Sequence, residues 1–265
     1  MKRAGAALGE VRSIVGALRD ETESTYVGPV LVTGMLAAQL ARQLGEGADP
    51  GAVVAGDTSR LSRSSVLVHV IAGDPSPEDD ELVRDAEKDG VPVILIQLWP
   101  QADWTKTFVL TPFVVECRAG EGFPVNEIAV RIVEAVGSPV DLGRRVPVLH
   151  EKVAEAVVGT SIVRTALLAS LGKKKRSARP LITLEQIRML TELRRLAHTA
   201  PVSGQDALKD AAPFALAALA GGFVFRQAAS TARRVLPGAI TDAAIAAAGT
   251  WALGEALRRY SNRLP

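Results

Sequence analysis

Very few side chains in this sequence have the type and spacing that a chemical site needs. Asp57 and Thr58 follow the apolar segment 52–56, and a carboxylate beside a hydroxyl could bind Mg²⁺. A magnesium ion without phosphates to share would be held weakly, and a carboxylate at a strand end commonly caps a turn. We therefore favour turn capping for Asp57, and we predict neither a metal site nor a catalytic residue.

The histidines and the cysteine add no catalytic group. His69, His150 and His198 lie far apart, and none has metal-ligand spacing with Cys, Asp or Glu. His69 lies inside an apolar segment, which favours a buried imidazole satisfied by hydrogen bonds over a ligand. Cys117, the only cysteine, has no histidine placed by the sequence to activate its thiol. A lone cysteine is typical of a reducing cytosol.

The elements that would position these residues alternate between strands and helices. The apolar strand segments are nearly continuous, which indicates burial on both faces and parallel pairing. We predict an α/β fold in residues 25–140, an open, mainly parallel sheet with helices on both faces, after an N-terminal helix in 1–24. The expected strands are 28–34, 52–57, 65–74, 91–98 and 108–117, and the expected helices are 35–44, 76–90 and 124–137.

The order of these elements resembles the GTPase domain of the Era-like (TRAFAC) class over residues 25–137. That class has a phosphate loop, GxxxxGK[S/T], after its first strand; the lysine neutralises phosphate and the hydroxyl binds magnesium. Here Met35 and Leu36 stand in place of the lysine and the hydroxyl residue, and no lysine occurs between Lys2 and Lys88. The resemblance therefore implies a scaffold that has lost its phosphate loop.

Two further motifs of that class are degenerate. Asp57 and Thr58 match its magnesium motif, but Arg60 replaces the glycine that contacts the γ-phosphate. The guanine motif N-K-x-D is missing, although the loop after Cys117 resembles the loop that packs under guanine. We expect no bound cofactor. The remnant of a nucleotide crevice would comprise Gly34, Asp57, Thr58, Cys117 and Ala119.

The second half of the chain differs in charge and in pattern. Residues 1–140 carry 12 basic and 20 acidic side chains, a net charge of −8, whereas residues 141–265 carry 19 basic and 9 acidic, a net charge of +10. An amphipathic helix is predicted at 148–172 and another at 181–200, and the segments 203–235 and 236–264 show no strand pattern. We predict a separate all-α domain in residues 141–265.

This half resembles the helical bacterial domain of unknown function 697 (DUF 697) over about residues 180–262. The resemblance rests on the segments 186–189, 236–238 and 247–254 and on Tyr260. It implies partnership with a GTPase-like domain and membrane association, and it implies no reaction.

Apolar helices beside a basic run also favour a membrane. The segment 211–225 is shorter than the about 20 residues that a span needs, and Asp242 adjoins the segment 243–254, so we expect peripheral or re-entrant attachment. Two buried helices of a soluble bundle remain the alternative. The cations would attract anionic lipid, or form only a solvated linker; they are Lys173, Lys174, Lys175, Arg176 and Arg179. Interleaved aromatic residues are missing, which disfavours nucleic acid.

Two tryptophans mark a third candidate surface. Trp99 and Trp104 flank a turn at the carboxyl end of an expected strand, where open sheets bind ligands. They would block the old nucleotide crevice, form a surface for a partner, or pack in the core.

These observations favour a non-catalytic, GTPase-like adaptor or scaffold with a protein partner. Charged residues interrupt the apolar run near the N-terminus, so we expect no secretory signal and a cytoplasmic protein at the inner face of the cell membrane. A nucleotide-binding protein that uses backbone contacts alone is one alternative. A module that binds anionic lipid is the other.

Overall fold

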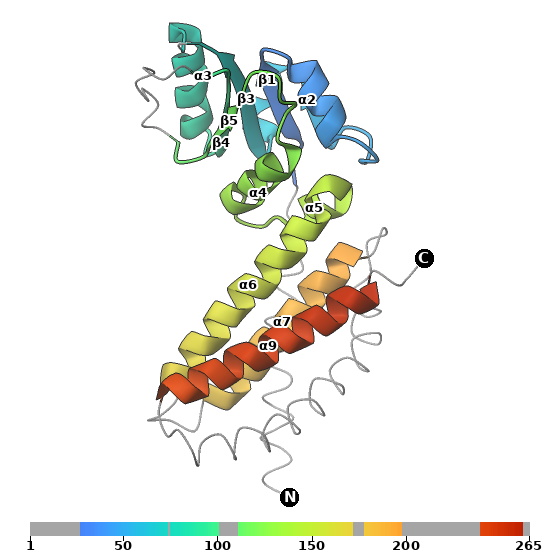
Figure 1. Ribbon diagram of the computed structural model, residues 1–265, viewed down its shortest axis with the longest axis vertical. Coiled ribbons are helices and arrows are strands. Elements are labelled where there is room, and N and C mark those ends of the chain that lie inside the picture. The colour runs from blue at the N-terminus through green and yellow to red at the C-terminus, as the bar shows by residue number, and fades with distance from the viewer. Residues whose placement is uncertain (1–26, 74, 101–110, 172–177, 198–238, 262–265) are drawn as a thin grey trace, which may run out of the picture. The chain divides into compact units, whose positions relative to one another are not determined.

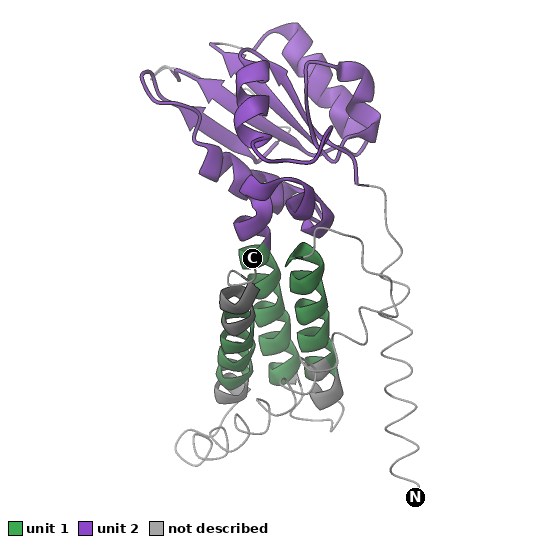
Figure 2. Ribbon diagram, turned by 90° about the vertical axis from the view of Figure 1, so that its right-hand side faces the viewer, with its two compact units in different colours: residues 1–25, 154–265 green, residues 26–153 purple. Residues whose placement is uncertain are grey.

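The structure is a computed structural model that describes residues 27–73, 75–100, 111–171, 178–197 and 239–261 (Figure 1). Packing divides them into two compact units, residues 27–153 and the described residues from 154 onward, which we call the sheet unit and the helical unit (Figure 2). The division lies inside helix α6 (Pro147–Leu171), later than the boundary after residue 140 that the sequence suggests. The helix expected within 1–24 lies outside the described residues.

The sheet unit is built on five strands that pair only in parallel, which confirms the predicted open parallel sheet. Their order across the sheet is β2-β1-β3-β4-β5. Residues 108–110 of the last expected strand lie outside the described residues. The strands are β1 (Val30–Gly34), β2 (Val53–Ala55), β3 (Val66–Ala72), β4 (Val93–Leu98) and β5 (Val114–Cys117).

Helices lie on both faces of this sheet, as predicted. Helix α2 (Ala37–Leu44) connects β1 to β2, and α3 (Pro77–Lys88) connects β3 to β4 in the opposite direction across the sheet. Because crossovers between parallel strands are right-handed, opposite directions put the two helices on opposite faces (Figure 1). Helix α4 (Val125–Ala135) packs against β4, and α5 (Val140–Arg145) follows it.

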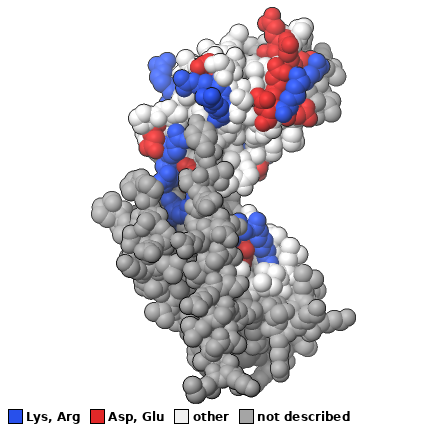
Figure 3. Space-filling view, turned by 180° about the vertical axis from the view of Figure 1, so that it is seen from behind, with Lys and Arg blue, Asp and Glu red and all other residues white. Residues whose placement is uncertain are grey.

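Helix α3 shows how the sheet unit separates apolar from charged side chains. Its Val83 and Ala86 pack in one buried cluster with Leu31, Leu67 and Leu95 from three neighbouring strands. Figure 3 shows charged side chains gathered on this helix. The exposed ones are Glu78, Glu81, Arg84, Glu87 and Lys88. An apolar interior and a charged exterior are typical of a domain in water.

The helical unit consists of helices in its described residues. Helix α7 (Ala178–Ala197) packs beside α9 (Ala239–Ser261). The helices predicted at 148–172 and 181–200 correspond to α6 and α7, and α9 lies within 236–264. The segments 203–235 and 211–225 lie outside the described residues.

Candidate functional site at the carboxyl edge of the sheet

The carboxyl ends of the parallel strands form one edge of the sheet, and the strand order reverses there at β1. Strand β1 lies between β2 and β3, so the connections after β1 and after β3 leave in opposite directions. Ligands of open α/β sheets bind outside the carboxyl ends of the strands at such a reversal. This edge is therefore the candidate site of the sheet unit.

The structure places the predicted crevice residues along this edge, but not in one cluster. Gly34 ends β1, and Asp57 and Thr58 follow the neighbouring strand β2. Cys117 ends β5, three strands from β1, and Ala119 comes after it. Three strand spacings correspond to about 14 Å. The two groups could reach only different parts of one extended ligand.

The connection from β1 to α2 consists of two residues, Met35 and Leu36. The Met35 backbone N–H donates a hydrogen bond to the carbonyl oxygen of Val70 on β3 over 2.9 Å. Leu36 has a left-handed backbone with φ of 55°. Both side chains are exposed. Strand β1 therefore passes into α2 through a tight turn with an apolar surface.

Gly34 is required by packing. Its φ is +86°, and a Cβ atom added there would lie 2.0 Å from the carbonyl oxygen of Val70. Only glycine allows this conformation and this approach of β1 to the backbone of β3. The glycine is explained without any bound phosphate.

Asp57 caps the 3₁₀ helix η1 (Thr58–Arg63). Its carboxylate accepts hydrogen bonds from the backbone N–H and the hydroxyl of Ser59 and pairs with Nε of Arg60 at 2.9 Å. The Ser59 hydrogen bonds, with the charge of Arg60, hold the pKa of Asp57 below its ordinary value. The favoured turn-capping role is confirmed. Within the described residues, no group of three or more His, Cys, Asp or Glu side chains could hold a metal ion.

Cys117 is buried. Burial raises the pKa of its thiol, and the charges of Glu127 and Glu121 raise it further. Since the thiolate is the reactive form of cysteine, a raised pKa and burial both disfavour this side chain as a nucleophile.

Trp99 lies on the same edge, directly after β4. Its backbone N–H donates to the carbonyl oxygen of Cys117 over 2.7 Å, and its φ is 53°. Its side chain is 51% exposed, so it is not a core residue. Leu36 and Trp99 are the only non-glycine residues with positive φ in the described part of the chain, and such a backbone is strained in bulky residues. We call Met35, Leu36 and Trp99 the edge patch. Trp104 lies outside the described residues.

A buried polar chain next to this edge escaped the sequence analysis. Thr33 Oγ1 lies 2.8 Å from His69 Nδ1, and His69 Nε2 lies 2.8 Å from Asp79 Oδ1. Thr33 and His69 face each other on paired strands and are each 3% exposed. Asp79 comes from the first turn of α3, where it forms a capping box with Ser76. The Ser-x-x-Asp spacing of that box is visible in the sequence, whereas the pairing of Thr33 with His69 is not.

The charge state of Asp79 determines which groups donate and which accept in the hydrogen bonds that join Thr33, His69 and Asp79. Burial disfavours its charged form, but hydrogen bonds from the Ser76 backbone and from His69 outweigh burial and lower the pKa of Asp79. An ionised Asp79 accepts the Nε2 proton, so Nδ1 of a neutral imidazole accepts the Thr33 hydroxyl proton. Hydroxyl, imidazole and carboxylate have this order in nucleophilic relays, but Thr33 is sealed from substrate. The prediction that His69 is a satisfied buried imidazole is confirmed.

Most of the basic run of the sequence is not described by the structure. Lys173, Lys174, Lys175 and Arg176 lie outside the described residues, and Arg179 belongs to the first turn of α7. At this edge, the exposed side chains of the edge patch are apolar, the carboxylate of Asp57 is engaged by Ser59 and Arg60, and the Cys117 thiol is buried. Comparisons with protein-family models, with curated proteins and with solved structures find no match for this chain.

Proposed function

We propose that this protein is a non-catalytic, GTPase-like adaptor that holds a protein partner at the carboxyl edge of its sheet and attaches to the inner face of the membrane through its helical unit. The two-residue connection of Met35 and Leu36 between β1 and α2 carries the proposal. The term GTPase-like rests on the resemblance in the order of the elements.

The edge is poorly suited to a nucleotide. Binding of phosphate at such an edge needs free backbone N–H groups and a nearby cation. The Met35 N–H is already bonded to Val70, and the side chains of Met35 and Leu36 are uncharged. Burying phosphate against them without a counter-charge is costly. Asp57, which follows the neighbouring strand β2 on the same edge, is engaged by Ser59 and Arg60.

The edge patch is better suited to a protein. Its exposed apolar side chains lie along one edge of the sheet, Met35 and Leu36 after β1 and Trp99 after β4, and tryptophan is enriched among the residues that dominate binding energy. Two of the three residues of the patch have a left-handed backbone. Such strain persists where the surrounding structure enforces it, and it is concentrated at functional sites.

Helix α6 and the basic run after it support membrane attachment. Of the described helices, one segment, Pro147–Ser170, is long and apolar enough to cross a membrane, and 28% of its most apolar window is buried. The core helix of a soluble protein meets the same criterion, so length and composition alone do not separate the two cases. The cations at 173–176, just past α6, would be attracted to anionic lipid headgroups.

Calorimetric titration of the full chain with GTP and Mg²⁺ tests the non-catalytic part of the proposal. We expect no binding up to about 1 mM nucleotide, which corresponds to less than about 4 kcal/mol of binding free energy. A dissociation constant in the micromolar range would overturn the proposal in favour of a nucleotide-binding protein.

A photocrosslinking amino acid tests the partner surface. Placed at Met35 or at Trp99 in living cells, it should give a discrete adduct with one protein. The same group at Glu87, an exposed residue of α3 outside the edge patch, is the matched control. Equal adducts from all three positions, or none from Met35 and Trp99, would contradict the proposed surface.

A further inference from the structure

The polarity of helix α6 reverses along its length. Residues four apart form one exposed stripe and one buried stripe on this helix. The exposed stripe runs through Glu151, Glu155, Gly159, Val163 and Leu167. The buried stripe runs through Leu149, Val153, Val157, Ser161 and Thr165. On the exposed stripe, acidic side chains in the first half are therefore followed by apolar ones in the second, with Thr160, Arg164 and Ser170 exposed beside them, while the buried stripe changes from apolar to hydroxyl side chains. The sequence predicts an amphipathic helix at 148–172; the helix is present, but its predicted amphipathic character is wrong.

The neighbouring helices show the same reversal where they meet the second half of α6. On α7, Leu181 is exposed while the Glu185 carboxylate is largely buried. On α9, Trp251 is 56% exposed and the preceding Thr250 is fully buried. Further along α7, past the reversed region, the usual arrangement returns. The buried side chains there are Met189, Leu190, Leu193 and Leu196.

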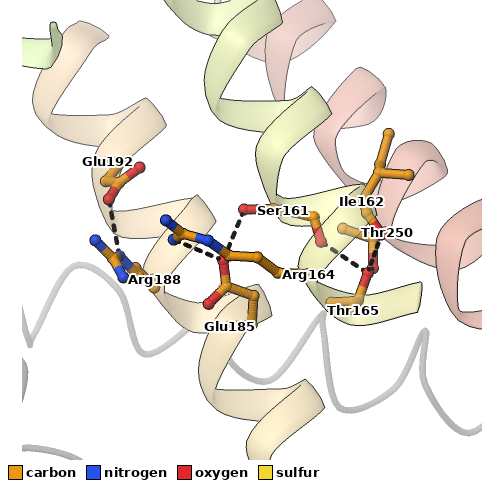
Figure 4. Close-up of polar contacts among 8 residues, drawn as sticks. All are labelled: Ser161, Ile162, Arg164, Thr165, Glu185, Arg188, Glu192 and Thr250. Carbon is orange, nitrogen blue, oxygen red and sulfur yellow. Dashed lines mark hydrogen bonds and ion pairs between the residues drawn. The ribbon is translucent and has the colours of Figure 1, made fainter. Parts of the chain in front are cut away.

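Hydrogen bonds inside the reversed region satisfy its polar groups (Figure 4). Ser161 Oγ and Arg164 Nη1 donate to Oε1 of Glu185 over 3.3 and 3.4 Å. Gln186 Nε2 donates to Thr250 Oγ1 over 3.3 Å. The Thr165 and Thr250 hydroxyls lie 3.2 Å apart, and each also bonds to a backbone carbonyl of its own helix. The one exposed cation in these contacts, Arg164, is thus paired with a carboxylate.

This distribution is unfavourable in water and favourable in lipid. Water drives apolar side chains inward, so exposed Val163 and Leu167, at 59% and 57%, gain nothing from it. Between lipid-exposed helices no such force acts, and Ser, Thr and Gln side chains bond across the helix interface instead. Ionisable groups in that setting face the bundle interior and pair with one another. Tryptophan is enriched where the apolar layer meets water.

We infer that this reversed region, formed by α6 from Gly159 onward with the facing parts of α7 and α9, lies in the apolar layer of an anionic membrane. The inference rests on the proposed membrane attachment but not on the edge patch. Residues 159–171 of α6 extend about 20 Å, less than the about 30 Å of a bilayer core, and four cations follow the helix at 173–176, so this region lies along the headgroup boundary with its exposed apolar side chains in the apolar layer rather than end-on in the membrane. The basic run that follows α6 supplies the charge complementary to anionic headgroups.

Tryptophan fluorescence of the full chain tests this placement. The variant Trp99→Phe/Trp104→Phe keeps Trp251, and the matched control Trp104→Phe/Trp251→Phe keeps Trp99. Each is mixed with phosphatidylcholine–phosphatidylserine vesicles whose acyl chains carry bromine. We expect a blue shift and strong quenching for Trp251 and neither for Trp99. If the protein sediments with the vesicles while Trp251 stays unquenched, the inference fails and membrane attachment stands. If it does not sediment at low salt, both fail.

A pair of exposed substitutions tests the same surface without disturbing the interior. Val163→Glu/Leu167→Glu should weaken vesicle binding by at least about tenfold, because acidic side chains are strongly disfavoured in the apolar layer. Ala38→Glu/Gln39→Glu adds the same charge on exposed positions of α2 and should leave binding within about twofold, because α2 belongs to the sheet unit and the inference puts no residue of that helix in the apolar layer. Equal weakening by both pairs would overturn the inference. Circular dichroism establishes that both variants are folded.

Discussion

The sheet unit and the helical unit differ in where they place polar side chains. In the sheet unit, α3 buries Val83 and Ala86 and exposes charged residues, and the buried polar side chains, among them those of the chain from Thr33 to Asp79, are few within an apolar core. In the reversed region of the helical unit, hydroxyl, amide and carboxylate groups lie inside and Val163, Leu167 and Trp251 lie outside. The two units of this protein therefore distribute polar and apolar side chains in opposite ways.

Helix α6 makes this difference sharp because it contains both arrangements. Its first turns belong to the sheet unit, with Leu149 and Val153 buried, and its last turns belong to the helical unit. A change of polarity within one helix reflects a change of surroundings rather than of secondary structure. Substitutions that perturb close packing and buried polar groups in each unit test whether the two units differ in this way.

The largest loss of stability is expected from Gly34→Ala, which disrupts the close packing of β1 against β3 in the sheet unit. The new methyl group would meet the backbone of β3, which cannot move without separating β1 from β3. We expect the free energy of unfolding to fall by at least about 4 kcal/mol. Hydrogen exchange of the β1 and β3 amides in the full chain measures it. Gly51→Ala is the control, with φ of +75° but nothing within 4 Å of the added Cβ, and should cost only about 1 kcal/mol. Equal losses would contradict the packing explanation.

Asp79→Asn tests the buried polar chain of the sheet unit. We expect a loss of about 1–3 kcal/mol in the free energy of unfolding at neutral pH. Since the pKa of Asp79 is lowered in the folded state, the carboxylate stabilises the fold above its unfolded pKa of about 3.9, and this contribution is lost as the pH falls through the lower folded value. Urea denaturation from about pH 5 to about pH 3 should therefore show a shallower acid loss in the variant than in the wild type.

The control for that experiment is Asp85→Asn on the same helix. Asp85 forms an exposed ion pair with Lys88, so its removal should cost less than about 1 kcal/mol. An acid profile that flattens as much for Asp85→Asn as for Asp79→Asn would show that the buried chain is not the source.

Gly254→Ala probes close packing in the helical unit. A Cβ atom there would lie 2.8 Å from Cγ2 of Val158 on α6, and we expect a cost of about 1–3 kcal/mol, reduced by the better helix propensity of alanine. Val158→Ala provides the missing space. The double variant should therefore lose about 1 kcal/mol less than the sum of the single variants, measured by thermal unfolding of the full chain. Strict additivity would place the two residues out of contact.

The smallest effect is expected at Leu36, in the edge patch. Leu36→Gly relieves a left-handed backbone, whereas Leu36→Ala removes the same side chain and keeps the strain. The glycine variant should be more stable than the alanine variant by about 1 kcal/mol or less, because glycine also makes the unfolded chain more flexible. Urea denaturation of the two variants measures the difference. A more stable alanine variant would mean that the patch is not strained.

Periodicity was informative for the sheet unit because its strands are apolar almost throughout. The runs around Leu31, Leu67 and Leu95 predict a parallel sheet, and the turn chemistry of Asp57 follows from its place at a strand end. Sequence could not supply the pairing of Thr33 with His69, which depends on register between distant segments. Nor could it show the left-handed backbone of Leu36 and Trp99, because bulky residues rarely adopt it.

The same method was less informative for the helical unit. A helical pattern assigns apolar residues to one inward stripe, and in α6 they occupy opposite stripes in the two halves. Runs of uncharged residues favour 211–225 and 243–254 as membrane segments; the first lies outside the described residues, and among the described helices it is α6 that meets the length and composition criterion. From the sequence alone, polar residues such as Ser161 and Thr165 are expected at the surface. Their burial depends on hydrogen-bond partners on α7 and α9.

The two outer strands of the sheet bear on how the chain resists aggregation. Strand β2 has three residues and β5 has four, so each lateral edge offers only a short row of backbone groups to another chain. Stable cross-β stacking needs segments of about six or seven residues. Short edge strands are a recognised protection against edge-to-edge pairing, and they also disfavour a partner that joins the sheet as an added strand. A partner that bound through side chains at the carboxyl edge would leave the backbone groups of the lateral edges unused, so such binding would not extend the sheet from one molecule to the next.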